Sequence, residues 1–134
     1  MTHPGRKIAL ALSALTLLAI GGLILFAPQT LHDLNGIKLD PSPAMMSEIR
    51  APGGLILVIG LFACAGLLWT SLERMALQAA SLILLTYGVS RLVSLPLDGI
   101  PPEGLLAAMV IEIGLGTWCA LLSRPWTMPL QTAS

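Results

Sequence analysis

Four long apolar runs alternate with short polar segments along the chain. Each run holds about 20 residues, the length that a helix needs to cross the hydrocarbon core of a bilayer. The links at 71–74 and 96–103 are short, and short links join helices that pack as antiparallel neighbours. The pattern predicts an all-α integral membrane bundle of four antiparallel transmembrane helices, with spans near 8–27, 51–70, 75–95 and 104–122.

The segment 28–50 is long enough to hold further structure between the first two spans. Leu31, Leu34 and Ile37 are interspersed with polar residues there, as in a short piece lying along the membrane interface. A solvated loop with a few apolar anchors fits the same pattern. Asn35 and Gly36 predict a turn within the segment.

A helix is predicted to start at Ser42, which is followed by a proline. A serine side chain accepts from the first free N–H groups, and proline is favoured at the first helical position. If this helix continues into the second span, Pro52 falls inside it and leaves the Glu48 carbonyl without its usual donor. The glycines at 53 and 54 then follow a simple kink or form a notch open to a ligand.

Composition supports the bilayer as the solvent of this chain. Of 134 residues, 55% are hydrophobic and 10% are charged, whereas a soluble domain carries about 25% charged residues. Seven basic and seven acidic residues cancel, which argues against nucleic acid as a partner. We expect residues 1–134 to form a single transmembrane domain whose immediate partner is the lipid bilayer.

Basic residues gather on one side of the predicted bundle. Because cytoplasmic loops are enriched in Lys and Arg, this side is predicted to be cytoplasmic, with both termini inside and the 28–50 loop outside. The predicted location is the inner membrane of a bacterium. Four basic residues lie on the inner side and two on the outer: Arg6, Lys7, Arg74 and Arg124 against Lys38 and Arg50.

Two charges fall inside the predicted spans. Glu112 lies eight residues after Gly104, the start of the fourth span, and Arg91 lies four residues before Leu95, the end of the third. A carboxylate in hydrocarbon costs roughly 2.5–3.5 kcal/mol, so it normally faces a partner, a cavity or water. We predict that Glu112 and Arg91 are in contact. Alternatively, Arg91 extends to the outer surface, where it also comes within reach of Asp98.

Small and polar residues mark one face on each of the last two predicted helices. These faces should point into the bundle, because small residues let transmembrane helices approach closely. Pro96 is predicted to end the third helix. The expected inward faces are Gln78, Ser81, Gly88 and Arg91 on the third helix, and Ala108, Glu112, Gly116 and Cys119 on the fourth.

Common cofactor and catalytic patterns are missing from the sequence. His3 and His32 lie outside the spans, and Cys64 and Cys119 are on different helices and in no CxxC motif. No His, Cys and carboxylate cluster has metal-ligand spacing, and no hydrolase, nucleotide-binding or metalloprotease motif occurs. We therefore expect no metal and no cofactor, and favour a protein that is not an enzyme.

Three segments together carry a family resemblance. They are Ser-Glu-Ile-Arg-Ala at 47–51 with glycines at 53 and 54, Arg-Leu-Val-Ser-Leu-x-Leu-Asp-Gly-x-Pro at 91–101, and a glutamate within the last span. This combination resembles the bacterial family called domain of unknown function 4345, over nearly the whole chain. The resemblance implies a small protein with four transmembrane helices and no established activity. The positions that match the family pattern are Glu48, Arg50, Arg91, Asp98 and Glu112.

The leading interpretation is a non-enzymatic inner-membrane accessory or scaffold subunit, whose protein partners are a larger membrane complex or further copies of the same chain. The first alternative is a small-ligand or proton-coupled carrier that uses Glu112 and Arg91. The second is a membrane enzyme acting on a lipid or quinone, with Glu48 or Asp98 as base. We predict that the functional surface is an outer-leaflet cluster of Glu48, Arg50, Arg91 and Asp98.

Overall fold

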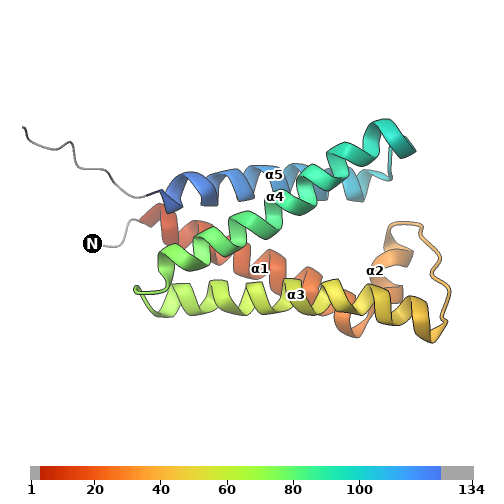
Figure 1. The fold of residues 1–134 in the computed structure, drawn as a ribbon, viewed down its shortest axis with the longest axis horizontal. Helices are drawn as coiled ribbons and strands as arrows, with labels where there is room; N and C mark the ends of the chain where they lie inside the picture. Colours follow the sequence, from red (N-terminus) through yellow and green to blue (C-terminus); the bar gives the residue numbers. More distant parts are fainter. Residues whose placement is uncertain (1–3, 125–134) are drawn as a thin grey trace, which may run out of the picture.

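The computed structural model describes residues 4–124, and these residues form helices and connecting segments with no strand (Figure 1). This agrees with the predicted all-α class. Four of the helices are long and apolar enough to cross a membrane, and the fifth is a short helix in the 28–50 segment. The helices are α1 (Pro4–Phe26), α2 (Pro28–Leu34), α3 (Pro43–Leu68), α4 (Glu73–Asp98) and α5 (Glu103–Ser123).

Helix α3 begins about eight residues before the predicted second span. The Ser42 hydroxyl accepts a hydrogen bond from the backbone N–H of Met45 at 3.4 Å, and Pro43 occupies the first helical position. This confirms the predicted helix start, since both residues satisfy or avoid the free N–H groups of a first turn. The helix then continues through Pro52 into the apolar run.

The prediction that Pro96 ends the third long helix is wrong. Helix α4 continues through Pro96 to Asp98, and the backbone N–H of Gly99 donates to the carbonyl of Leu95 at 3.2 Å. A proline within the last turn removes only one backbone hydrogen bond. The helix ends instead at Gly99, whose φ of 95° is accessible to glycine at little cost.

The 28–50 segment contains the short helix α2, so part of this segment is regular structure and not a solvated loop throughout. Pro28 begins the helix, and the Asn35 side chain donates back to the carbonyl of Leu31 at 2.9 Å. Gly36, with a φ of 71°, makes the predicted turn after it. Figure 1 shows α2 at the end of the molecule opposite the described start of α1.

Helix α1 packs mainly on α3, through glycines that bring the two backbones together. A Cβ added at Gly60 would lie 2.9 Å from the backbone N of Leu18, and one added at Gly21 would lie 2.5 Å from the backbone N of Leu57. Real side chains essentially never approach a backbone so closely. The glycines therefore set the distance between α1 and α3, as small residues do between transmembrane helices.

Helix α4 packs mainly on α5 in the same way. A Cβ at Gly88 would meet the Ile113 side chain at 2.6 Å, and one at Gly116 would meet Leu85 at 2.9 Å. The predicted close approach at Gly116 is thus confirmed. Figure 1 shows the α4/α5 pair lying alongside the α1/α3 pair, and contacts between the two pairs are less extensive than those within each pair.

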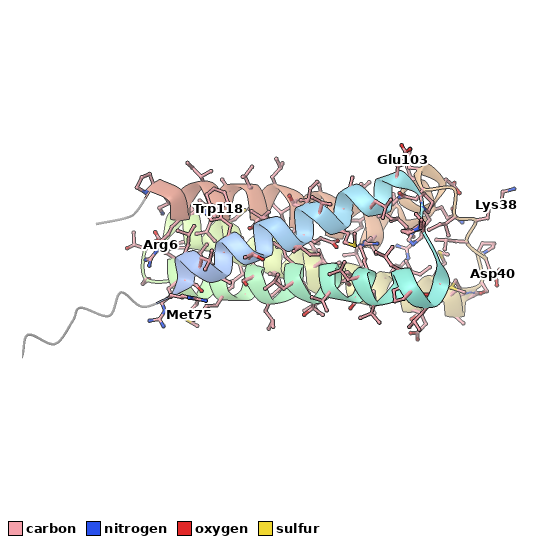
Figure 2. The ribbon with its side chains drawn as sticks, turned by 90° about the horizontal axis from the view of Figure 1, so that it is seen from above. Arg6, Lys38, Asp40, Met75, Glu103 and Trp118 are labelled. Atoms are coloured by element: carbon pink, nitrogen blue, oxygen red, sulfur yellow. The ribbon has the colours of Figure 1, made fainter. Side chains whose placement is uncertain are left out.

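The outer surface of the bundle is apolar along its length, while charged groups gather at the two ends. Exposed aliphatic side chains occur on all four long helices, for example Leu15, Val58, Leu82 and Val110. Figure 2 shows Arg6 near one end and Lys38, Asp40 and Glu103 at the other. Apolar sides and charged ends are what a lipid bilayer requires of a protein that crosses it several times.

Candidate functional site

The predicted contact between Arg91 and Glu112 is confirmed. The Arg91 Nε donates to Glu112 Oε2 at 3.0 Å across the interface of α4 and α5. The Arg91 side chain is 31% exposed and that of Glu112 is 14% exposed, so the arginine lies nearer the surface. Gly88 lies one helical turn before Arg91, and a Cβ placed there would contact the Glu112 Cβ at 3.3 Å. The small residue thereby gives the glutamate room to approach α4.

A small cavity of about 50 Å³ adjoins this ion pair, and we call it the pair cavity. It lies between the two helix pairs, because residues of α1, α3, α4 and α5 line it. Its polar wall contains Thr16, Tyr87, Arg91 and Glu112. The remaining wall is aliphatic and contains Leu17, Ile20, Ile24, Ile56, Ile83 and Leu84.

The other three predicted site residues do not join the Arg91–Glu112 pair. Arg50 is exposed and donates to the carbonyl of Leu25 near the end of α1. Asp98 is also exposed and accepts from the Ser94 hydroxyl at 2.6 Å, one turn back on its own helix. Glu48 is exposed, with no side-chain hydrogen bond or ion pair to any residue within 4–124. Asp98 was expected only within reach of Arg91, and in the structure it pairs with Ser94 while Arg91 pairs with Glu112.

The notch considered at Gly53 is occupied by the protein itself. A Cβ at Gly53 would lie 2.6 Å from the Ile24 side chain and 2.9 Å from the backbone N of Leu25. Helix α1 thus fills the space that the missing side chain leaves. Nothing lies within 4 Å of the corresponding position at Gly54. The first glycine of the pair serves helix packing.

A second charged cluster, which sequence reasoning missed, lies at the end of the bundle where α1 starts. Arg6 Nη1 donates to Glu73 Oε1 at 3.4 Å, and Lys7 Nζ lies 3.9 Å from Glu73 Oε2. Both cations also donate to carbonyls of the last helical turns: Arg6 to Leu122 at 3.0 Å and Lys7 to Leu67 at 2.6 Å. The cluster therefore connects α1 with α3, α4 and α5.

Glu73 is the least exposed charged side chain of this cluster, at 5%. Its Oε2 is buried without a hydrogen-bond partner in the described residues. The sequence contained a signal for this ion pairing, because Glu73 is the only acidic residue in the segments assigned to the inner side, where four basic residues also lie. The two cations that bind the last-turn carbonyls also complement the negative ends of α3 and α5.

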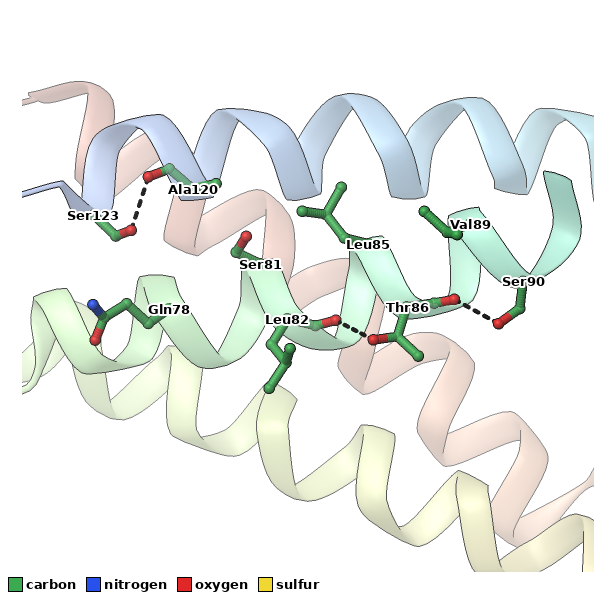
Figure 3. A pocket seen from close by; sticks show the side chains of 9 residues that line it. All are labelled: Gln78, Ser81, Leu82, Leu85, Thr86, Val89, Ser90, Ala120 and Ser123. Carbon is green, nitrogen blue, oxygen red and sulfur yellow. Dashed lines mark hydrogen bonds between the residues drawn. The ribbon is translucent and has the colours of Figure 1, made fainter. Parts of the chain in front are cut away.

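An open groove of about 550 Å³ runs along α4 beside the end of α5 (Figure 3). Thr86 and Ser90 satisfy their hydroxyl groups by donating to the carbonyls one turn back, Leu82 and Thr86. Gln78 is exposed and has no hydrogen-bond partner among the described residues. The α4/α5 groove is lined by Gln78, Ser81, Leu82, Leu85, Thr86, Val89, Ser90, Ala120 and Ser123.

The groove corrects part of the predicted inward faces. Ser81, Gly88, Gly116 and Cys119 are buried as expected, but Gln78 is exposed in the groove. Polar residues spread over an arc of about 140° cannot all face one neighbouring helix, and α5 covers only part of that arc. Helical periodicity places these residues on one face but does not determine which edge of that face α5 leaves uncovered.

The described residues hold no group of three or more His, Cys, Asp or Glu side chains that could bind a metal ion. Both cysteines are free thiols, and Cys119 is buried with its Sγ 3.3 Å from the Ser13 Oγ. This contact lies between α1 and α5 and satisfies two buried polar atoms at once. It is a packing contact within the core and provides no redox pair.

Comparison with known proteins gives a single family. The family model described as Domain of unknown function (DUF4345) matches residues 6–123. That range covers the four long helices almost completely, along with the pair cavity and both charged clusters. No curated protein and no solved structure matches the chain.

Proposed function

Because the chain belongs to the DUF4345 family, whose function is unknown, we propose a function from its geometry: it is a non-enzymatic accessory subunit of a larger membrane assembly. The subunit crosses the membrane four times and binds a transmembrane helix of its partner in the α4/α5 groove. The proposal rests on the groove, where polar side chains line an open surface along an otherwise apolar face.

In this proposal the four long helices are antiparallel and both termini are cytoplasmic. The contacts of Gly21 with Leu57 and of Gly60 with Leu18 support opposite directions for α1 and α3. Arg6, at one end of Figure 2, supports a cytoplasmic location for that end by the positive-inside rule. The proposed membrane is the inner membrane of a bacterium, the location predicted from the sequence.

The groove has the dimensions and chemistry to accept a helix. Ser90 lies twelve positions after Gln78, a rise of about 18 Å along α4. Lipid tails cannot hydrogen-bond the exposed amide of Gln78, whereas a polar side chain on a neighbouring helix can. The small side chains of Thr86, Ser90 and Ala120 allow the backbone of a partner helix to approach the groove closely.

The geometry favours this function over an enzyme that acts on a lipid or quinone. The pair cavity, at about 50 Å³, is far smaller than the roughly 300–1,000 Å³ of ordinary small-molecule pockets. The α4/α5 groove has that volume, but it is open and no acidic, basic or thiol side chain lines it. Glu48 and Asp98, the bases considered for such an enzyme, are exposed and do not line that cavity. The groove offers a larger and more continuous surface for a partner.

A photo-crosslinking experiment tests the proposal. A crosslinking amino acid is placed at Val89 in the groove, and at Val58, an exposed valine of α3 outside it, as the matched control. We expect a protein adduct from position 89 only, and less of it in the Gln78→Leu variant. Equal adducts at both positions, or lipid adducts alone, would contradict the proposal. An adduct of two copies of this chain would replace the accessory role by self-association.

A further inference from the structure

The pair cavity contains polar atoms without protein partners. The hydroxyls of Thr16 and Tyr87 and the Oε1 atom of Glu112 form no hydrogen bond to any described residue, although all three residues line the cavity. These groups come from α1, α4 and α5. All three residues are partly buried, and polar groups in such positions that lack a protein partner normally bind water.

The size of the cavity matches a small group of water molecules. A water needs about 10–15 Å³ of cavity volume and two to four polar partners, and the cavity offers about 50 Å³. It therefore has room for about three to five waters. A pair that served only to join α4 and α5 would require neither the space nor the hydroxyl group of Thr16 on α1.

We propose that the pair cavity is a hydrated proton-exchange site in which Glu112 is the proton acceptor. A hydronium ion among the cavity waters transfers one proton to Glu112 Oε1, which yields a neutral carboxylic acid and one water molecule. The ion pair with Arg91 is lost in that step, and deprotonation restores it. The outer wall of the site is Arg91, whose greater exposure gives water a route along its guanidinium group.

Few charged or titratable groups face Glu112 within the cavity. Helix α4 contributes Arg91 and Tyr87, while α1 and α3 contribute Thr16 and aliphatic side chains. The ionisable groups that line the site are thus one carboxylate, one guanidinium and one phenol. This site uses neither Gln78 nor any other residue of the α4/α5 groove, so it stands independently of the proposed accessory role.

Infrared spectroscopy of the purified full chain tests the exchange. On acidification the other carboxyl groups among the seven Asp and Glu residues also take up protons, so we expect one protonated-carboxyl band, shifted in D₂O, that is missing from Glu112→Gln while the bands of the other groups remain. Glu103→Gln, on the same helix at an exposed position, should keep the band. An unchanged set of protonated-carboxyl bands in Glu112→Gln, or a Glu112 band that does not shift in D₂O, would overturn the proposal.

A second measurement needs no variant at the ion pair. Tyr87 is the single tyrosine of the chain, so its hydroxyl-radical labelling can be followed without ambiguity. Water next to its ring should make labelling of Tyr87 several-fold faster than that of Phe62, a half-buried aromatic residue of α3. Thr16→Val, which removes one water partner with little change of shape, should reduce the difference. Equal labelling of Tyr87 and Phe62 would show a dry cavity and refute hydration.

Discussion

Arg6 and Glu73 lie 67 positions apart in the sequence, and Arg6 Nη1 donates to Glu73 Oε1 at 3.4 Å. The contact joins the first turns of α1 and α4. Lys7 approaches the other oxygen of the same carboxylate while it donates to α3, and Arg6 also donates to α5. One buried glutamate thus organises the end of the bundle at which all four long helices are connected.

Replacing Glu73 should therefore destabilise the bundle. We expect Glu73→Gln to lower the free energy of unfolding by about 3 kcal/mol, near the lower limit for breaking a buried ion pair, because Arg6 and Lys7 keep their carbonyl acceptors. The measurement is unfolding of the purified protein in mixed detergent micelles. Arg74→Gln, at the exposed neighbouring position, is the control and should have little effect. Similar losses in both variants would contradict a special role for Glu73.

The Arg91–Glu112 pair should show energetic coupling. In a double-mutant cycle with Arg91→Gln and Glu112→Gln, we expect a coupling energy of about 1–3 kcal/mol, since the residues contact each other directly. The same cycle between Arg91→Gln and Glu103→Gln serves as the control and should give a value near zero. Additive effects in the first cycle would mean that the contact does not stabilise the fold.

Helix packing at Gly60 should tolerate no side chain. We expect Gly60→Ala to lower the free energy of unfolding by about 1–3 kcal/mol, the usual cost of overpacking, because its Cβ would lie 2.9 Å from the Leu18 backbone N. Gly54→Ala on the same helix is the matched control, because nothing lies within 4 Å of its added Cβ. It should be neutral or stabilising by up to about 1 kcal/mol from helix propensity. A milder effect at position 60 than at position 54 would disprove the packing account.

The proposed topology is testable with reporter fusions. A reporter that is active only in the cytoplasm should be active when fused after residue 134. A reporter that is active only on the external side of the membrane should be active when inserted within residues 30–40. The expectation follows from the four basic residues assigned to the inner side. An external C-terminus would contradict the proposed topology, because it would place the end of the bundle that contains Arg6 on the external side.

Asp98→Asn should leave stability nearly unchanged. Asp98 is exposed at the end of α4, where its negative charge opposes the helix dipole and its hydrogen bond is with Ser94 on the same helix. We expect a change in free energy of unfolding below about 0.5 kcal/mol, as for most surface substitutions. Loss of a bound partner without loss of thermal stability would make Asp98 part of a recognition surface. A large fall in stability would instead show a structural role.

The pair of Arg91 and Glu112 could be predicted because each residue, taken alone, is an expensive charge inside an apolar run. Position along the helix gave their depths, and the short link placed α4 beside α5. The outer-leaflet cluster could not be judged in the same way. Arg50 and Asp98 lie near helix ends, where solvent, backbone carbonyls and local side chains compete with distant charges.

The sequence by itself determined the number of long helices and the need for lipid around them, because hydrophobic length and composition act locally along the chain. It also determined the helix start at Ser42, since a cap is formed by residues three positions apart. Only the tertiary structure decided that Glu73 is buried and Gln78 is exposed. Burial of a given side chain depends on which neighbouring helix covers it, and that choice results from glycine contacts between residues distant in sequence.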